Sequence, residues 1–432
     1  MKDVQNAIYS IVETRGKECY CILCHAIDIA IEHQPNMPQM QFICNEVCKR
    51  TKKRTAAAIS KALNRATKDI WQNGKRDMLR YYWIEEAPTA KELICLISAK
   101  LWADQQSEAY EKILSGALGS SYSIARTLRW FTLYLLLGTS AAVAFEGNVF
   151  NIGIDGQLYM GAMATAVVGL FCSNLPGILL YPLCILSGIL AGALWGMLAG
   201  FLNLKFHANM VVITLMLNYV ATLFTSYCIN YPLHDYSNTI TRMTNEISDN
   251  AFLTILLPGT QLTSALFYAI IVLVVFAIWM NKTSTGFEIK LMGKNADFAR
   301  IMGINLESKT ALLMGVSGGI AGLAGALEIM GVQHCFIQEF LNGVGFDGLV
   351  VTMLAGNSFG LLPIAALFMS VIESGSTALE MFSNISRSIT DILTGIIIMF
   401  VTVQLVFPKL HARSLRQLCT MKKNKKWRNS NQ

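Results

Sequence analysis

The chain has 432 residues, of which 53% are hydrophobic and only 15% are charged. An average soluble domain carries about 25% charged residues, so the composition argues against a soluble globular protein, and the apolar content excludes a disordered one. Charge divides the chain into three regions: residues 1–104 carry a net charge of +4, residues 105–407 a net charge of −5, and residues 408–432 a net charge of +8. We therefore expect a soluble head, a charge-poor body and a basic tail.

The head, residues 1–104, has the apolar spacing of a small helical domain. The pattern predicts a short helix over 42–50, a turn over 51–54 and a longer helix over 55–71, with Thr55 as its N-cap and Gly74 at its end. This is the order of elements in a helix-turn-helix domain.

Basic and amide side chains in the head are of the kinds that contact DNA. Five of the six residues 49–54 are basic, and such clusters bind phosphates, while Asn, Arg and Lys side chains read base edges in the major groove. A solvated basic turn is the alternative interpretation. The predicted DNA-binding residues are Lys52, Lys53, Arg54, Ser60, Lys61, Asn64 and Arg65.

Two cysteine pairs in the head, Cys21 with Cys24 and Cys44 with Cys48, could together supply the four ligands of a zinc site. Both pairs lie in apolar helical runs without the Gly or Pro turns of zinc knuckles. Since a free cysteine commonly acts as a small buried hydrophobe, we expect no metal site and no cofactor.

From Tyr20 to Trp102 the head resembles the C-terminal effector domain of the stage-zero sporulation regulator. The matching features are Ala26-Ile27, a helix that ends in Trp71 before Asn73-Gly74, and the run from Pro88 through Glu92 to Leu101. The resemblance implies DNA binding. It places the recognition positions at Ala57, Ala58, Ser60, Lys61, Asn64 and Arg65, and because Ala58 and Ser60 stand where that family has charged residues, base specificity differs or is weak.

The body, residues 105–407, contains hydrophobic segments of the length that crosses a membrane, about 20 residues for roughly 30 Å of hydrocarbon. Residues 178–202 and 262–280 contain no charged residue. We expect an all-α fold with about eight membrane spans, some of them re-entrant. The other segments lie near 130–145, 157–173, 209–231, 308–331, 343–356, 361–377 and 388–407.

Basic residues in short loops predict the orientation of the body. The tail, residues 408–432, and the loop 281–309 are rich in Lys and Arg and should be cytoplasmic, whereas the loop 232–261 should lie outside. Counting spans backwards then places the residues before Arg129 outside, where a DNA-binding head could not work. Arg126 and Arg129 oppose that assignment, because they favour a cytoplasmic start for the first span.

Two features within the body suggest close packing and a polar path. Gly188, Gly192, Gly196 and Gly200 recur every four residues, and Gly318, Gly322 and Ala326 repeat this pattern, which indicates a seam within a tight bundle or with a second subunit. A polar break at 150–157 interrupts the apolar run. The predicted translocation-pathway residues are Asn151, Asp155, Gln157 and Asn218; Glu328, Asp347, Glu373 and Asp391 are further acids of the body for which an interfacial position is the alternative.

The run from Phe150 to Gly161 is similar to a signature of the permease subunits of bacterial ABC importers for nucleosides, simple sugars and branched-chain amino acids. In that family the acid at Asp155 is more often Glu. Residues 293–304 are similar to the cytoplasmic coupling loop of the family, and 318–325 and 343–348 match further. The resemblance covers residues 110–407, and the family's first span is expected to be missing.

This resemblance implies a protein that carries out no chemistry and assembles with others. The implied partners are a cytoplasmic ABC ATPase, a second permease subunit and an extracytoplasmic substrate-binding lipoprotein. The implied coupling residues are Gly293, Asn295, Asp297, Arg300 and Gly303. No phosphate-binding loop of the form G-x-x-x-x-G-K-[ST] is found, which agrees with energy supplied by a partner.

We therefore expect a non-enzymatic, multi-pass permease of the plasma membrane, in contact with lipid, with a DNA-binding domain before it. The long outer loop after Tyr231-Pro232-Leu233 favours the nucleoside branch over the sugar branch. Two alternatives remain open: a membrane-tethered transcription regulator, or a chimaeric product of two gene fragments joined near residues 103–110.

Overall fold

The computed structural model describes residues 2–12, 18–33, 38–51, 55–233, 242–341 and 343–382. Within these ranges the regular structure is helical, with two isolated β-bridges and no strand, which confirms the all-α prediction. The chain divides into a head unit, residues 1–112, and a body unit, residues 113–432. The predicted span 388–407, with Asp391, and the basic tail 408–432 lie outside the described residues.

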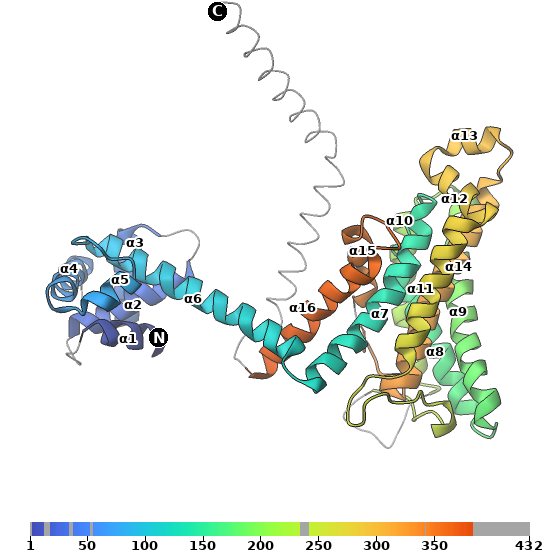
Figure 1. Ribbon diagram of the computed structural model, residues 1–432, viewed down its shortest axis with the longest axis horizontal. Helices are drawn as coiled ribbons and strands as arrows, with labels where there is room; N and C mark the ends of the chain where they lie inside the picture. The colour runs from blue at the N-terminus through green and yellow to red at the C-terminus, as the bar shows by residue number, and fades with distance from the viewer. Residues whose placement is uncertain are drawn as a thin grey trace, which may run out of the picture. The chain divides into compact units, whose positions relative to one another are not determined.

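The head unit is built from short helices and the first part of a long one (Figure 1). Two of them lie where the sequence predicts a short helix followed by a longer one, and Lys52, Lys53 and Arg54 between them are outside the described residues. The helices are α1 (Lys2–Ile11), α2 (Glu18–Glu32), α3 (Met40–Thr51), α4 (Ala56–Asn73), α5 (Arg76–Tyr81) and α6 (Ala90–Leu118).

Helix α4 is held in the head unit by its caps and by one apolar stripe. The Thr55 hydroxyl accepts a hydrogen bond from the Ala58 N–H, and the Gly74 N–H donates to the carbonyl of Ile70, so the predicted ends are confirmed. The stripe is completely buried in the core at Ile59, Leu63, Ala66 and Ile70. Burial of each large aliphatic side chain contributes about 1.5–3 kcal/mol, so this stripe anchors α4 and leaves its opposite face free.

One cysteine of each pair in the head unit contributes to its core, whereas Cys21 is exposed and Cys48 is partly buried. Cys24 and Cys44 are buried among apolar side chains. Burial raises the pKa of the Cys24 thiol to about 11, which keeps it neutral at physiological pH. Among the described residues, no group of three or more His, Cys, Asp or Glu side chains is placed to hold a metal ion.

The body unit is a bundle of long apolar helices with a short pair at one end (Figure 1). Its helices are α7 (Ser121–Glu146), α8 (Ile154–Phe171), α9 (Gly177–Phe206), α10 (Met210–Asn230), α11 (Ala265–Lys282), α12 (Ser284–Lys294), α13 (Ala296–Ile301), α14 (Leu306–Glu328), α15 (Val344–Leu354) and α16 (Leu362–Phe382). A 3₁₀ turn spans Asp249–Ala251, and a π-helix, Ile329–Gln333, continues α14.

Within the described residues, six helices are long and apolar enough to cross a membrane; the prediction of about eight spans also counted 388–407, which lies outside those residues. They are α7, α8, α9, α10, α11 and α14 with its π-helix. Helix α15 has 11 residues, which at about 1.5 Å per residue reach only about half of a roughly 30 Å hydrocarbon layer. It cannot be a span by itself.

Helices α15 and α16 both pack against α7, and α15 also contacts α8. The Gly345 N–H at the start of α15 donates to Asp155 of α8. Leu362 at the start of α16 packs at Gly138 in the middle of α7, and further along α16 Ser374 bonds to Arg126 near the start of α7. In the segment between these helices Phe359 is buried, whereas Ser358 and Leu361 are exposed.

The glycine pattern is a seam within this chain. A Cβ on Gly192 of α9 would collide with the carbonyl oxygen of Gly318 of α14, and a Cβ on Gly322 would collide with that of Gly188. The two helices therefore approach backbone to backbone, which only small residues allow. Of the two interpretations, packing inside one bundle is the one that the structure supports.

The helix that contains the predicted first span, α7, begins already at Ser121 and not near residue 130. Arg126 and Arg129 therefore lie inside the helix. Arg126 donates to the Ser374 hydroxyl and carbonyl and to the Gly116 carbonyl, and Arg129 is paired with Glu328. Because both charges are satisfied inside the protein, neither requires a cytoplasmic position, and their conflict with the predicted orientation disappears.

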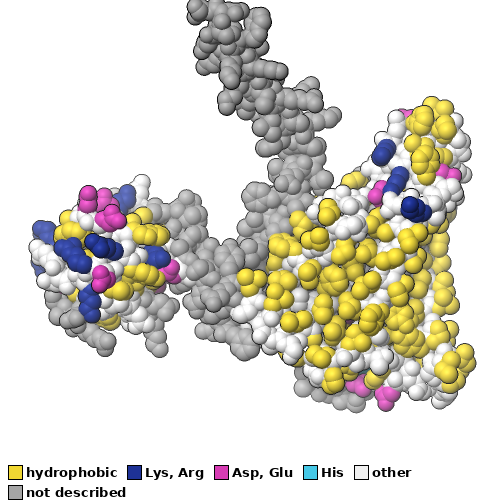
Figure 2. Space-filling view, viewed as in Figure 1, with side chains coloured by type: hydrophobic (Ala, Val, Ile, Leu, Met, Phe, Trp, Pro, Cys, Tyr) yellow, Lys and Arg dark blue, Asp and Glu magenta, His cyan; other side chains and the backbone are white. Residues whose placement is uncertain are grey.

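The two loops that were predicted to face opposite sides lie at opposite ends of the bundle, separated by α11. Helices α12 and α13 form one end, and the segment 242–264 lies at the other (Figure 1). Figure 2 shows apolar side chains covering the body between these ends, with basic side chains gathered near α12 and α13 and acidic ones at the far end. This distribution agrees with a cytoplasmic α12–α13 end.

Candidate functional site

The polar break in the sequence is a structured turn between α7 and α8. Asn151 is completely buried in it. Its amide nitrogen donates to Gln157 Oε1 at 2.9 Å and to the Ser317 hydroxyl of α14 at 2.8 Å, and its oxygen accepts from the Gly153 N–H. The Ser140 hydroxyl of α7 donates to the Ser317 carbonyl at 2.7 Å. This network joins the break to α7, α8 and α14.

Asn218 of α10 joins the same break from another side. Its amide nitrogen donates to the Ile152 carbonyl at 2.9 Å, and its oxygen accepts from the Gly156 N–H at 2.8 Å. One side chain thus satisfies both a carbonyl before α8 and an N–H in its first turn, where helices leave such groups unpaired.

Asp155 links the break to the start of α15. Its Oδ1 accepts a hydrogen bond of 2.6 Å from the Gly345 N–H, and its side chain is buried. The carboxylate therefore lies at the N-termini of both α8 and α15, where helix dipoles favour negative charge. A Cβ on Gly345 would lie only 2.6 Å from the Asp155 backbone nitrogen, so the glycine is what lets α15 approach.

The four predicted pathway residues are therefore brought together around one break. All four are buried; Asn151, Asp155 and Asn218 hydrogen-bond to groups of other elements, and Gln157 hydrogen-bonds to Asn151. Of the other acids, Glu328 pairs with Arg129, and Asp347 accepts from the Tyr134 hydroxyl at 3.2 Å, while Glu373 lies in α16. The arrangement shows how these residues hold the break, and their place along a substrate path stays a prediction.

The predicted coupling residues lie in α12, in α13 and at their ends. Asn295 ends α12 and caps α13, where its side chain accepts from the Phe298 N–H at 3.0 Å. Asp297 and Arg300 are exposed on α13, beside Phe298, Ile301 and Met302, of which Ile301 is 83% exposed. Only Ala299 of this short helix is buried against the bundle. Helix α13 is thus an exposed knob with apolar and charged side chains.

Two glycines fit this knob to the bundle. Gly303, with a φ of +83°, makes the turn after α13 in the left-handed region that favours glycine. Gly293 lies so close to the end of α7 that a Cβ there would collide with the Glu146 carbonyl oxygen. Ile289 and Met292 of α12 also face Gly147, which ends α7 shortly before the break. A displacement of α12 would therefore reach the α7–α8 break directly.

Comparison with known proteins covers this body unit. Residues 123–402 match the family described as "Branched-chain amino acid transport system / permease component". The chain belongs to this permease family. It is a permease subunit of an ABC importer and a multi-pass protein of the plasma membrane. The match begins at residue 123, so the head unit lies outside it.

Three curated relatives of the permease are named for a substrate. Guanosine ABC transporter permease protein NupP of Bacillus subtilis (strain 168) is 31% identical over 314 residues, which cover 72% of this chain and 89% of that protein. Nucleoside ABC transporter permease protein NupB of Lactococcus lactis subsp. cremoris (strain MG1363) is 33% identical over 306 residues, which cover 69% of this chain and 84% of that protein. Glucose ABC transporter permease protein TsgB13 of Haloferax volcanii is 28% identical over 312 residues, which cover 70% of this chain and 82% of that protein.

Sequence reasoning missed several residues of the permease that the structure places in polar contacts. Ser140 and Ser317 complete the network around the break, but single serines in apolar helices give no signal of their own. Arg129 was interpreted only as a topology signal, although a basic residue within an apolar helix is itself a sign of a buried partner. Glu328 can be identified from the sequence as an acid of the body, but not as the partner of Arg129.

Proposed function

We propose that the permease conducts nucleosides and is driven by a cytoplasmic ABC ATPase that binds α13. A second permease subunit and an extracytoplasmic substrate-binding lipoprotein complete the importer, and this chain itself carries out no chemistry. The observation that carries the proposal is the knob of α13, exposed at the basic end of a bundle whose relatives include proteins named for guanosine and nucleosides.

The contacts of α12 supply a physical route for coupling. Gly293 touches the end of α7, and Ile289 and Met292 face Gly147. A push on α13 therefore moves the break that Asn151, Asp155 and Asn218 hold. Because these side chains join α7, α8, α10, α14 and α15, a shift there is transmitted to five helices at once.

The substrate class is tested by uptake and competition. Cells that produce the importer with this permease are given labelled guanosine, with unlabelled guanosine or glucose in excess. We expect unlabelled guanosine to abolish uptake of the label and glucose to leave it unchanged. If glucose is taken up instead, and guanosine neither enters nor competes, the nucleoside assignment is wrong and the sugar branch replaces it.

We also propose that the head unit binds duplex DNA when separated from the body. Ser60, Lys61, Asn64 and Arg65 are exposed on α4, together with Lys68, on the face opposite the buried stripe. A helix with one face anchored in a core and the other carrying basic and amide groups suits the major groove. Lys52, Lys53 and Arg54 would add phosphate contacts.

The salt dependence of binding by a fragment of residues 1–112 tests this second proposal. Each neutralised phosphate contributes about −0.9 to the slope of log K against log salt. Replacing Lys52, Lys53 and Arg54 by Ala should flatten the slope, and Lys61→Ala with Arg65→Ala should weaken binding. Lys91→Ala, an exposed lysine of α6 away from α4, is the control. A fragment that is helical by circular dichroism but binds no duplex at low salt would refute DNA binding.

A further inference from the structure

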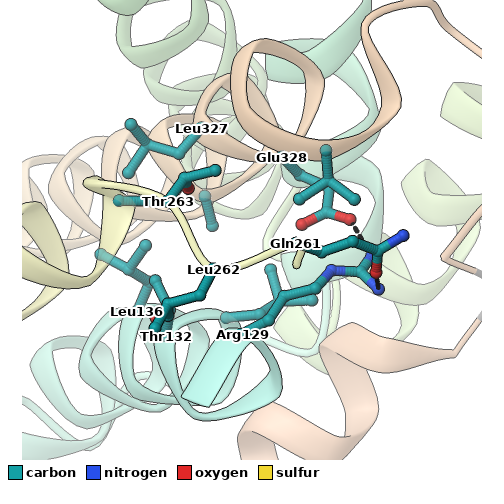
Figure 3. Close-up of a pocket in the computed structure, with 12 residues that line it drawn as sticks. Arg129, Thr132, Leu136, Gln261, Leu262, Thr263, Leu327 and Glu328 are labelled. Carbon is teal, nitrogen blue, oxygen red and sulfur yellow. Dashed lines mark hydrogen bonds and ion pairs between the residues drawn. The ribbon is translucent and has the colours of Figure 1, made fainter. Parts of the chain in front are cut away.

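A buried ion pair joins three elements at the outer end of the body, the end that carries the segment 242–264. Arg129 of α7 is paired with Glu328 of α14, and it donates to Gln261 Oε1, just before α11, at 2.9 Å. In Figure 3 these three side chains point toward one another. The Arg129 side chain is only 14% exposed and that of Glu328 only 5%.

Burying two charged groups in this position costs free energy of hydration. Two ions taken out of water lose hydration that their mutual attraction repays only in part, so a buried ion pair is weak evidence of a stabilising role. The glycine seam with α9 and the contacts with α8 already hold α14 in the bundle. Tight packing of α14 therefore does not depend on the Arg129–Glu328 pair.

The helix that carries Glu328 changes its geometry directly after this residue. Glu328 ends α14 and directly precedes the π-helix Ile329–Gln333, whose wide turn is closed by the His334 N–H donating to the Ile329 carbonyl at 2.9 Å. π-turns are rare and frequent at functional sites. Returning this turn to α-helix would remove one residue from it, and thus rotate Glu328 by about 100° relative to the following chain, which the ion pair could not follow.

A small cavity of about 20 Å³ lies beside the pair, lined by Thr132 and Leu136 of α7 and by Leu262 and Thr263 (Figure 3). It has room for about one water molecule. The exposed Gln261 lies at its edge. Water can therefore reach the ions as soon as the outer ends of α7 and α14 separate, which lowers the cost of parting them.

We propose that Arg129, Glu328 and Gln261 form a latch that closes the outer ends of α7 and α14 and opens once in each transport cycle. The inference rests on the proposed function for its cycle, but the closed state is a property of this chain alone. Because Gln261 belongs to the outer segment before α11, a partner that binds this segment from outside would act on the latch first.

Accessibility of the cavity to a reagent tests the latch. Thr132 is 7% exposed, so a Thr132→Cys variant, with the 11 native cysteines replaced, should react slowly in intact cells with a membrane-impermeant maleimide. Adding Arg129→Gln should raise the labelling rate at rest on the order of a hundredfold, since removing one partner of a buried pair shifts such an equilibrium at least this far. Arg129→Lys, which keeps the charge, should raise it less and serves if the Gln variant fails to insert.

Two further variants separate the latch from general loosening. Exchanging the charges, Arg129→Glu with Glu328→Arg, should restore protection of the cysteine introduced at Thr132. Lys309→Gln breaks the ion pair that Lys309, at the other end of α14, makes with Glu288 at 2.6 Å, and should leave labelling unchanged. Continued protection in the inserted Arg129→Gln and Arg129→Lys variants, or no recovery on charge exchange, would overturn the latch.

The cycle is tested in the same Thr132→Cys protein with its native pair. Labelling should rise when cells import nucleoside and fall when they are depleted of ATP. Equal labelling in both conditions, in cells where uptake is measured and present, would show a permanent structural pair and overturn the opening step. Absence of any uptake would instead contradict the proposed function, while the labelling of resting cells would still decide the closed latch.

Discussion

Asp155 illustrates what a single side chain does at the centre of the permease. The sequence shows an acid within the polar break. In the structure its carboxylate accepts a hydrogen bond from the Gly345 N–H, 190 residues further along the chain. That partner could not be predicted from periodicity, because it depends on α15 entering the bundle without crossing it. At the residue scale, the acid was visible in the sequence and its hydrogen bond was not.

We expect Asp155→Ala to destabilise the body more than Asp155→Asn. Removing the acceptor leaves the buried Gly345 N–H unpaired, which costs about 1–3 kcal/mol, whereas the Asn amide oxygen can still accept from it. Thermal unfolding of the purified protein in detergent measures both variants. An Ala variant as stable as the parent protein would show that the 2.6 Å hydrogen bond contributes nothing.

Helices α9 and α14 show how much of a helix-packing seam can be predicted from the spacing of small residues. The recurrence of glycine indicates a seam, and Gly188, Gly192, Gly318 and Gly322 do form one. Spacing alone could not say which helix packs against which, since any two faces of small residues are compatible. It also left open whether the seam lies within one chain or between two.

Adjacent glycines on α14 provide a matched test of this seam. Gly318→Ala would place a Cβ against the Gly192 carbonyl, whereas a Cβ on Gly319 meets Ile189 at an ordinary 3.4 Å. Overpacking typically costs about 1–3 kcal/mol, so Gly318→Ala should lower the temperature of unfolding and Gly319→Ala should not. Equal effects of the two substitutions would mean that the helices do not approach as closely as described.

Apolar segments in the sequence located most helices of the body, but not their roles. Residues 343–356 were as apolar as a span, yet α15 is too short and is enclosed by α7 and α8. The start of α7 was misplaced because Arg126 and Arg129 look like loop residues, and only their partners Ser374 and Glu328 make them acceptable inside a helix. In both cases contacts distant in sequence override local hydrophobicity.

For the whole molecule, orientation decides what the head unit can do. With Arg126 and Arg129 satisfied inside the protein, nothing in α7 opposes an outer start of this span. We therefore predict that the basic α12–α13 end faces the cytoplasm and that the head unit lies outside, away from DNA. The intact chain would accordingly be a permease and a poor regulator, even if the separated head unit binds DNA.

A single cysteine before α7 tests this orientation. Ser107→Cys, in a chain without its native cysteines, should react with an impermeant maleimide in intact cells and be protected in inside-out vesicles. Lys205→Cys, in the last turn of α9 at the end of the bundle that should face the cytoplasm, should behave in the opposite way and serves as the control. Labelling of the Ser107→Cys variant only from the cytoplasmic side would revive the membrane-tethered regulator.

The exposed knob of α13 is central to the proposed function, because the importer works only if a partner ATPase acts on it. ATP-dependent guanosine uptake by the Arg300→Glu variant tests this most directly, with Lys205→Glu, in the last turn of α9, as a control of the same charge change. We expect Arg300→Glu to insert normally and to lose nearly all uptake, and Lys205→Glu to retain it. Normal uptake by the Arg300→Glu variant would contradict the account of this chain as an ATPase-coupled nucleoside permease.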